Sequence, residues 1–492
     1  MELGDNEKSP LFPKKENEPV KLKRTVGVLS ASALVFGSCV GAGIFISPKG
    51  VYEKAGSPGA GLMVWCLSGV IATLCTLAYA ELGTMMPQSG GEFVYIHRVY
   101  GDCLAFIFSF CNTLLIKPAS LSVVAVLFGE YLCNMIWGPA TNDLIVKAVA
   151  VALIVTLGLI NIVGVNVIAK VCTVISVLKL AVVGFLVACG IAIVIKGQGV
   201  VTNFQLSLSF EGSSTNPADY GLAFYYCLFT FQSWNSLNYM TEELKTPEKT
   251  LPLGGFIGLT GVTLSYFLCN VAYLMMFSLH QIVDTNTIAM DSGFIAFGRA
   301  GEITMSLGLL VSCLGCLGGA ICCISRNIQS TAETGIFPSF LSGINKTFQT
   351  PIKAIITVVL TMSVYVLVDA NMLIPFLSTV EWLFYCVTFS TILYLRYKEP
   401  NSKRPFKVPL FVSVFLFLIT GTFVVLPLFS EESRVTTLLG LSWLPLGAAV
   451  YGIRHLIKQC CYKKLEQKTS SQSSLDSGYS EVDGNDKECK LS

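Results

Sequence analysis

Residues 35–48 read VFGSCVGAGIFISP, and this stretch decides how the rest of the chain is interpreted. It lies within an apolar run, yet Gly41 and Gly43 stand one residue apart near its middle. Glycine lowers helix stability and lets backbone N–H groups approach a ligand closely. A packing role is the alternative, because Gly37 and Gly41 also form a small-xxx-small contact face. The stretch therefore predicts either a helix break that binds a ligand or a close contact between helices.

The composition around this stretch excludes a soluble globular protein. The chain has 492 residues, of which 53% are hydrophobic and 13% charged, and its mean hydropathy is +0.66. A soluble domain carries about 25% charged residues, so this chain lacks the polar side chains to cover itself in water. The 33 Lys and Arg balance 31 Asp and Glu and fall in short loops, which argues against a nucleic-acid partner. We expect a protein of the lipid bilayer.

Apolar stretches long enough to cross a bilayer recur along the chain. A spanning helix needs about 20 apolar residues, and its backbone groups must be hydrogen-bonded internally. Twelve stretches are of this kind, the ninth being short, and they are centred near Val40, Leu74, Leu115, Ile154, Val182, Phe229, Tyr266, Leu314, Leu360, Tyr385, Phe417 and Leu446. The sequence therefore predicts an all-α polytopic membrane protein with twelve transmembrane helices in residues 25–456, flanked by tails at 1–24 and 457–492.

The distribution of Lys and Arg predicts the orientation of these spans. Short loops rich in Lys and Arg remain cytoplasmic, and the few basic residues on the side opposite the N-terminus are Lys49, Lys54, Lys196, Arg299 and Arg434. Both termini are therefore predicted to be cytoplasmic, with the first span directing insertion in place of a cleaved signal peptide. The sequon at residues 345–347 then lies inside and stays unglycosylated.

The tail and the cysteines carry weaker signals. Residues 466–492 have almost no apolar content, which predicts disorder in a tail that is either phosphorylated or a passive solvated end. Cys460 and Cys461 stand beside basic residues at the membrane edge and are candidates for palmitoylation. The 18 cysteines lie mostly in apolar runs as small hydrophobic residues. No ligand set accompanies Cys313 and Cys316, so we expect neither a metal nor another cofactor.

A second interruption occurs in the sixth predicted span. Phe229 is followed shortly by the run Gln232-Ser233-Trp234-Asn235. Such residues are costly against lipid, so they should face protein or a water-filled cavity. The first and sixth spans are five apart, which is the relation between corresponding helices of two inverted repeats. The sequence predicts a 5+5 inverted repeat whose broken helices 1 and 6 meet at the midplane.

Three ionisable residues within the spans need partners. Lys179 lies deep in the fifth span, where it requires groups such as the free carbonyls of a broken helix, unless it reaches an interface instead. Lys117, followed by proline in the third span, either marks a structural kink or has a function. Glu381 in the tenth span is either a buried carboxylate or a residue just inside the outer interface.

Eight short blocks between residues 21 and 456 follow one another along the chain: KLKR (21–24), GAGIFISPKG (41–50), YAELGT (79–84), SGGE (89–92), LAFY (222–225), TEE (241–243), YLRY (394–397) and RPFKVP (404–409). These blocks resemble, in the same order, the light chains of heteromeric amino acid transporters. This group contains the L-type, b(0,+)-type and cystine/glutamate exchangers, and its aromatic-preferring member is one candidate identity. The resemblance implies a twelve-span fold of the amino acid/polyamine/organocation superfamily and sodium-independent exchange of amino acids at the plasma membrane.

The resemblance also implies where a substrate binds. Backbone amides at the first break would hold its carboxylate, which agrees with the positive end of a half-helix, and backbone carbonyls at both breaks would hold its α-ammonium group. Phe229 would be an aromatic gate, and Lys179 would occupy the place of sodium in coupled relatives. The implied substrate-binding residues are Cys39, Gly41, Ala42, Gly43, Phe229, Gln232, Ser233, Asn235 and Glu381.

Departures from the family pattern limit this transfer. The segment at residues 231–234 is bulkier and more polar than in relatives, so their side-chain specificity does not carry over. Glu381 stands where the cystine/glutamate exchanger has an arginine, and the reversed charge disfavours acidic substrates. We predict neutral substrates, aromatic ones included, with cationic ones open. The outer loop at 134–143 has no cysteine for bonding a single-span glycoprotein heavy chain, so only a noncovalent association is open.

Other classes of function fit the sequence less well. A proton- or sodium-coupled symporter on the same fold is disfavoured because no His lies within the spans and because Lys179 takes the cation position. A membrane enzyme would need a set of acids, His or nucleophiles at one depth, which the chain does not offer. A transport-inactive sensor or scaffold stays open because of the altered sixth span.

Overall fold

Helices make up the regular secondary structure of this chain. The computed structural model describes residues 24, 26–41, 43–88, 90–138, 142–163, 165–205, 209–333, 337–345, 348, 350–429 and 431–456. These ranges contain no strand, only an isolated bridge between Val26 and Leu244, so the all-α prediction is confirmed for them. Both predicted tails, with the candidate palmitoylation sites Cys460 and Cys461, lie outside these ranges, as do Ala42 and part of the sequon.

Long apolar helices and shorter helical segments follow one another along the described chain. The label η denotes a segment of 3₁₀ or π helix. In chain order they are α1 (Val28–Cys39), α2 (Gly43–Ala55), α3 (Pro58–Met85), α4 (Glu92–Tyr100), α5 (Asp102–Cys111), η1 (Asn112–Ile116), α6 (Lys117–Trp137), α7 (Asp143–Val163), α8 (Val165–Ile195), η2 (Val201–Phe204), α9 (Pro217–Thr230), η3 (Ser236–Glu243), α10 (Pro247–Met276), α11 (Leu279–Asp284), α12 (Ile288–Glu333), η4 (Ser339–Leu341), α13 (Ile352–Tyr365), α14 (Ala370–Lys398), α15 (Leu410–Val425), η5 (Leu426–Phe429) and α16 (Glu431–Leu441). A last helical stretch covers 443–456.

The described residues contain nine helices that are long and apolar enough to cross a membrane, and the bent pair α1 and α2 would make a tenth. The remaining two predicted spans, centred on Phe229 and Leu360, coincide with α9 and α13, which have 14 residues each. That length is shorter than a bilayer requires of one straight helix. The chain is therefore a polytopic all-α membrane protein, while the count of twelve spans and the inverted repeat stay predictions.

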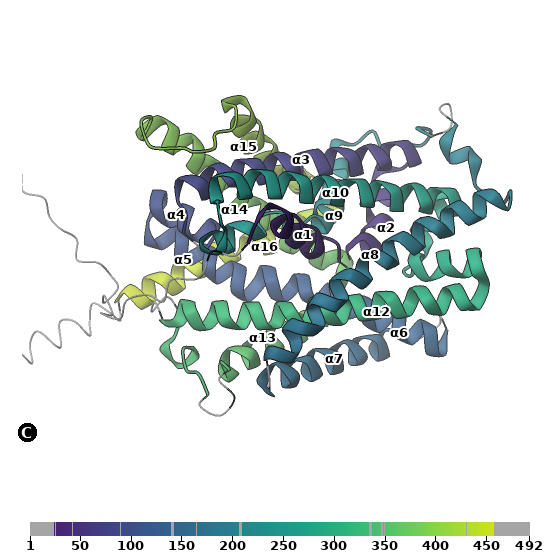
Figure 1. The fold of residues 1–492 in the computed structure, drawn as a ribbon, viewed down its shortest axis with the longest axis horizontal. Helices are drawn as coiled ribbons and strands as arrows, with labels where there is room; N and C mark the ends of the chain where they lie inside the picture. Colours follow the sequence, from purple (N-terminus) through teal and green to yellow (C-terminus); the bar gives the residue numbers. More distant parts are fainter. Residues whose placement is uncertain are drawn as a thin grey trace, which may run out of the picture.

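Most of the long helices lie roughly along one direction, and the short helices α1 and α2 lie in the middle of the molecule (Figure 1). The long helices α3 and α10 pack against each other, α8 crosses α12, and α14 packs against α15. In the middle of this assembly α1 packs against α10, and α2 packs against α9. The long helices therefore form a frame that encloses the two interrupted segments.

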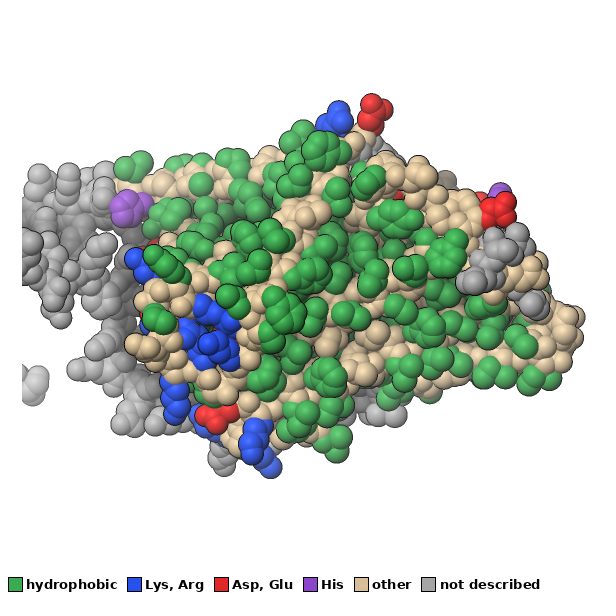
Figure 2. Space-filling model, turned by 90° about the horizontal axis from the view of Figure 1, so that it is seen from above, with side chains coloured by type: hydrophobic (Ala, Val, Ile, Leu, Met, Phe, Trp, Pro, Cys, Tyr) green, Lys and Arg blue, Asp and Glu red, His purple; other side chains and the backbone are tan. Residues whose placement is uncertain are grey.

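One end of the molecule is rich in basic side chains. Figure 2 shows hydrophobic side chains along the length of the molecule and Lys and Arg gathered at one end. This is the end at which Figure 1 places α4 and α5, and we call it the basic end. An apolar belt with one basic end is the pattern that the positive-inside rule describes for a membrane protein.

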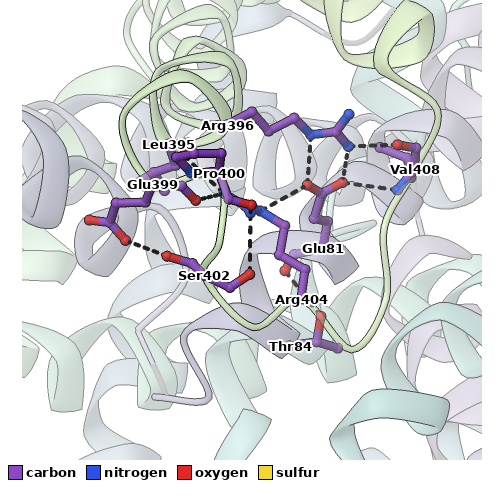
Figure 3. A network of polar contacts seen from close by, with 9 residues as sticks. All are labelled: Glu81, Thr84, Leu395, Arg396, Glu399, Pro400, Ser402, Arg404 and Val408. Carbon is purple, nitrogen blue, oxygen red and sulfur yellow. Dashed lines mark hydrogen bonds and ion pairs between the residues drawn. The ribbon is translucent and has the colours of Figure 1, made fainter.

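A buried carboxylate ties two helices together at the basic end (Figure 3). Glu81 of α3 is 1% exposed and accepts hydrogen bonds from Nε and Nη2 of Arg396 at the end of α14. The backbone N–H of Val408 also donates to it, at 2.9 Å, and Nε of Arg404 lies 3.8 Å away. Since a buried charge requires such partners, this cluster fixes α3 to α14 and to the loop that follows it.

Candidate functional site

The first helix is broken where the sequence predicts. The helix α1 ends at Cys39, Val40 has φ −68° and ψ 98°, and α2 begins at Gly43 with its axis bent by 58° from that of α1. Helix ends leave backbone N–H and C=O groups without intrahelical partners. The break therefore presents such groups in the middle of the molecule.

The sixth predicted span is broken too, although no glycine marks the break. The helix α9 ends at Thr230, residues 231–235 form turns, and the 3₁₀ segment η3 follows. Ser233 has a φ of +83°, the one positive value among the described non-glycine residues. Such a conformation costs about 1–3 kcal/mol, so surrounding contacts must hold it. One of them is the Thr76 hydroxyl, which donates to the Trp234 carbonyl at 3.2 Å.

The two breaks contact each other. The hydroxyl of Tyr266, from α10, lies 2.7 Å from the carbonyl oxygen of Cys39 and 2.9 Å from that of Thr230, the last residues of α1 and α9. The Cys39 thiol also lies 3.7 Å from the carbonyl oxygen of Phe231. A side chain built on Gly43 would come within 3.0 Å of the Thr230 backbone. The absence of a side chain at residue 43 therefore permits the close approach of the two broken helices.

A cavity of about 460 Å³ lies against both breaks, and we call it the central cavity. Its size falls within the range of about 300–1,000 Å³ typical of small-molecule sites. From the predicted site it is lined by Cys39, Gly41, Gly43, Phe229, Gln232 and Ser233. Six residues that the sequence assigns to one site are thus brought together by α1, α2, α9 and the turns after α9.

Two predicted site residues do not line the central cavity. The amide of Asn235 donates to the Glu92 carboxylate of α4, which also accepts a hydrogen bond from the Tyr239 hydroxyl at 2.6 Å. Glu381 accepts hydrogen bonds from the Gln232 amide at 2.7 Å and the Tyr385 hydroxyl at 3.1 Å. Glu381 is therefore a buried carboxylate that Gln232 and Tyr385 hold.

Lys179 is buried beside the first break. It is 8% exposed, and its Nζ lies 3.4 Å from the carbonyl oxygen of Gly37, in the last turn of α1. Carbonyls of a last helical turn lack intrahelical partners. The alternative in which this side chain extends to an interface is therefore wrong, and the expected contact with the broken helix is present.

Sequence reasoning missed one wall of the central cavity. Along α12 the wall is formed by Cys316, Ala320, Cys323 and Asn327, whose spacing of four, three and four residues places them on one helix face. The spacing of these four residues was the signal in the sequence that could have predicted this wall. The wall spans about 16 Å of helix and approaches the C-terminal end of α12.

The third predicted span supplies the wall around Lys117. Lys117, Ser120 and Asn112 line the cavity, and the Ser120 hydroxyl donates to the side-chain carbonyl of Gln232 at 2.9 Å. The sequence singled out Lys117 only as a possible kink or functional residue. The structure places it in the cavity wall, immediately after the π-helical turn η1.

A second, smaller cavity of about 200 Å³ lies near the end of the molecule opposite the basic end. It contains charged groups of both signs from α2, α6, the start of α7 and the residue before α14: Lys49, Glu130, Asp143, Lys147 and Asp369 are among its lining residues. Phe45 and Gly50 of α2 also line it, so α2 reaches from one cavity to the other. The two breaks therefore lie between the central cavity and this second cavity.

Comparisons with known proteins agree with this geometry. A family model described as amino acid permease matches residues 26–449. The cystine/glutamate transporter of Homo sapiens is 34% identical over 417 residues, which cover 84% of this chain and 82% of that protein. The b(0,+)-type amino acid transporter 1 of Mus musculus is 33% identical over 420 residues, covering 85% of each. The Asc-type amino acid transporter 1 of Mus musculus is 32% identical over 424 residues, covering 85% of this chain and 79% of that protein.

Proposed function

The chain belongs to the amino acid permease family, and from this membership we propose that it is a sodium-independent exchanger of neutral L-amino acids, aromatic ones included, at the plasma membrane. It is a membrane transport protein, not an enzyme. The observation that carries the proposal is the meeting of two broken helices at the central cavity. Broken helices that meet between two spaces are the arrangement of alternating-access carriers.

The backbone at the breaks is suited to a zwitterion. The amides of Ala42 and Gly43, with Gly41, bind the substrate carboxylate at the N-terminus of α2, where the helix dipole favours negative charge. The carbonyls of Cys39, Phe229 and Gln232 bind the α-ammonium group. The Cys39 oxygen already accepts one hydrogen bond from Tyr266, and a carbonyl oxygen can accept two.

The walls of the central cavity favour an uncharged substrate side chain. Gln232 separates Glu381 from the cavity by binding its carboxylate, and Lys117 lines the cavity itself. The positive and negative charges therefore offset each other near the substrate. Phe229, which is 7% exposed, closes over the substrate as an aromatic gate.

Lys179 replaces a coupling ion. Its permanent charge at the Gly37 carbonyl supplies the positive group that sodium would supply in a coupled carrier. Sodium is then not required, and the sodium gradient does not drive transport. Asn235 acts with Glu92 beside the second break, where it contributes to the shape of the site.

The basic end faces the cytoplasm in this proposal, because Lys- and Arg-rich loops stay inside. Both termini are then cytoplasmic. A single-span heavy chain associates, if at all, without a disulfide, since the outer loop has no cysteine and Cys133, the nearest thiol, is buried.

The test is a trans-stimulation panel in proteoliposomes that contain the purified chain. Vesicles are loaded in turn with leucine, tyrosine, arginine and glutamate, and uptake of labelled leucine or tyrosine is measured. We expect internal neutral amino acids to accelerate uptake most and glutamate least, with no change when sodium is replaced. A requirement for sodium or a proton gradient would favour a symporter, and an absence of counterflow by a folded protein would favour a sensor or scaffold.

A further inference from the structure

A third cavity lies at the basic end, away from the central cavity, and shares no lining residue with it. Its volume is about 860 Å³, and we call it the apolar cavity. Its walls come from α5, η1, the end of α12, η4, α13 and the last helical stretch: Phe106, Phe110, Thr113, Leu114, Ile328, Phe337, Pro338, Ser339, Phe340, Leu341, Thr357, Val450, Ile453 and Arg454. Most of these side chains are hydrocarbon.

We propose that the apolar cavity binds an anionic phospholipid from the membrane leaflet at the basic end. Residues 106–114 along its wall correspond to about 12 Å of helix, which is deep enough to take up a substantial part of an acyl chain. An apolar cavity of this kind does not hold water stably. The proposal rests on the membrane location of the chain and not on its transport activity.

The mouth of the apolar cavity opens where lipid is available. Phe340 and Ile453 line it and are each 59% exposed, whereas Phe106 and Ile328 on the inner wall are 3% and 1% exposed. Hydrocarbon surface that faces outward from a membrane protein contacts acyl chains. The same chains can therefore continue from the exposed rim into the buried part.

Two cationic side chains, Arg454 and Lys353, stand where the head group of a bound lipid would lie. The guanidinium of Arg454 lies 5.5 Å from the ring centre of Phe106, in the cavity wall. Lys353 is exposed and stands one turn before the lining residue Thr357, whose hydroxyl donates to the Lys353 carbonyl at 2.9 Å. Asp102 is the neighbouring acidic group, and its carboxylate lies 2.8 Å from the His97 ring. Arg454 and Lys353 together outnumber this one carboxylate. The local charge therefore favours a phosphate with a net negative head group over a zwitterionic one.

The test is native mass spectrometry of the full chain with phosphatidylserine or phosphatidylcholine of identical acyl chains. We expect one phosphatidylserine retained per chain, in preference to phosphatidylcholine. Val450→Trp narrows the cavity, because it places a larger side chain in its wall, and should weaken retention of both lipids. The double variant K353Q/R454Q should weaken phosphatidylserine by about fivefold per charge, or roughly 25-fold, and leave phosphatidylcholine unchanged. The matched control is K249Q, a basic residue in the first turn of α10 that does not line the cavity.

Two outcomes would overturn the proposal. Equal retention of the two lipids by the wild-type chain, or unchanged retention by Val450→Trp, means that the cavity does not select this lipid. Thermal unfolding and amino acid counterflow verify the fold of Val450→Trp, and K353Q/R454Q gives an independent answer because both residues are at the rim. Mass spectrometry measures lipid retention without any transport assay. A negative result for lipid binding can therefore be distinguished from a failure of the proposed exchange activity.

Discussion

Replacing Gly43 by alanine tests the contact between the two breaks. A Cβ at this position would lie 3.0, 3.1 and 3.2 Å from the Cα, Cγ2 and Cβ of Thr230. Favourable carbon contacts lie at about 3.5–4.0 Å, so Thr230 and the start of α2 must move apart by a few tenths of an ångström. Overpacking of this kind costs about 1–3 kcal/mol, which corresponds to roughly a 5–150-fold change in an equilibrium. We expect Gly43→Ala to lower exchange by a factor in that range.

The assay is counterflow of labelled leucine or tyrosine in proteoliposomes with equal amounts of folded protein. Gly184→Ala in α8 is the matched control, because a Cβ there has open space around it. The control should exchange as the wild type does. Normal exchange by Gly43→Ala, or an equal loss in both variants, would refute the role of the close approach.

Three further predictions concern charged groups. Lys179→Ala should reduce counterflow by about tenfold or more, because a buried hydrogen bond to a charged group contributes about 1.5–3 kcal/mol, and sodium should not restore it; a wild-type rate would contradict the ion-replacement role. Glu81→Gln should lower the free energy of unfolding by about 3–5 kcal/mol, because the Arg396 cation stays buried without its partner; thermal unfolding that matches the wild type would show that the cluster does not hold α3 to α14. Hydrogen bonds from Ser402 and Arg98 lower the pKa of the exposed Glu399 carboxyl. The contribution of this carboxylate to the free energy of unfolding is therefore complete above its ordinary pKa of about 4.3. That contribution is lost as the pH falls through the lower pKa of the folded state. The difference in thermal stability between the wild type and Glu399→Gln should therefore stay constant from about pH 5.5 to 8 and shrink only in stronger acid; a difference that changes near neutrality would contradict it.

The first break could be predicted from local sequence, whereas the second could only be suspected. Gly41 and Gly43 weaken the helix by themselves, so residue type indicated the break as one of two alternatives, the other being a contact between helices. The second break has no glycine, and Ser233 takes a positive φ that its own residue type disfavours. Tertiary contacts from Thr76 and Tyr266 offset that cost, and such contacts between distant helices are not visible in a linear pattern.

The composition of the site was predictable in part, for a similar reason. Polar residues within a span signal that they avoid lipid, but not whether a ligand or another side chain satisfies them. Asn235 and Glu381 are satisfied by Glu92 and Gln232, within the protein. Cys323 and Asn327 of α12 line the central cavity instead, and only their helical spacing indicated a shared face.

The most direct test of the central claim is an experimental structure of the full chain in lipid with leucine bound. The account predicts that the amino acid lies in the central cavity between residues 41–43 and 229–233, with its carboxylate at the start of α2 and its side chain beside Phe229. Leucine bound elsewhere in the chain, or a first helix that runs without interruption through residues 37–45, would contradict it.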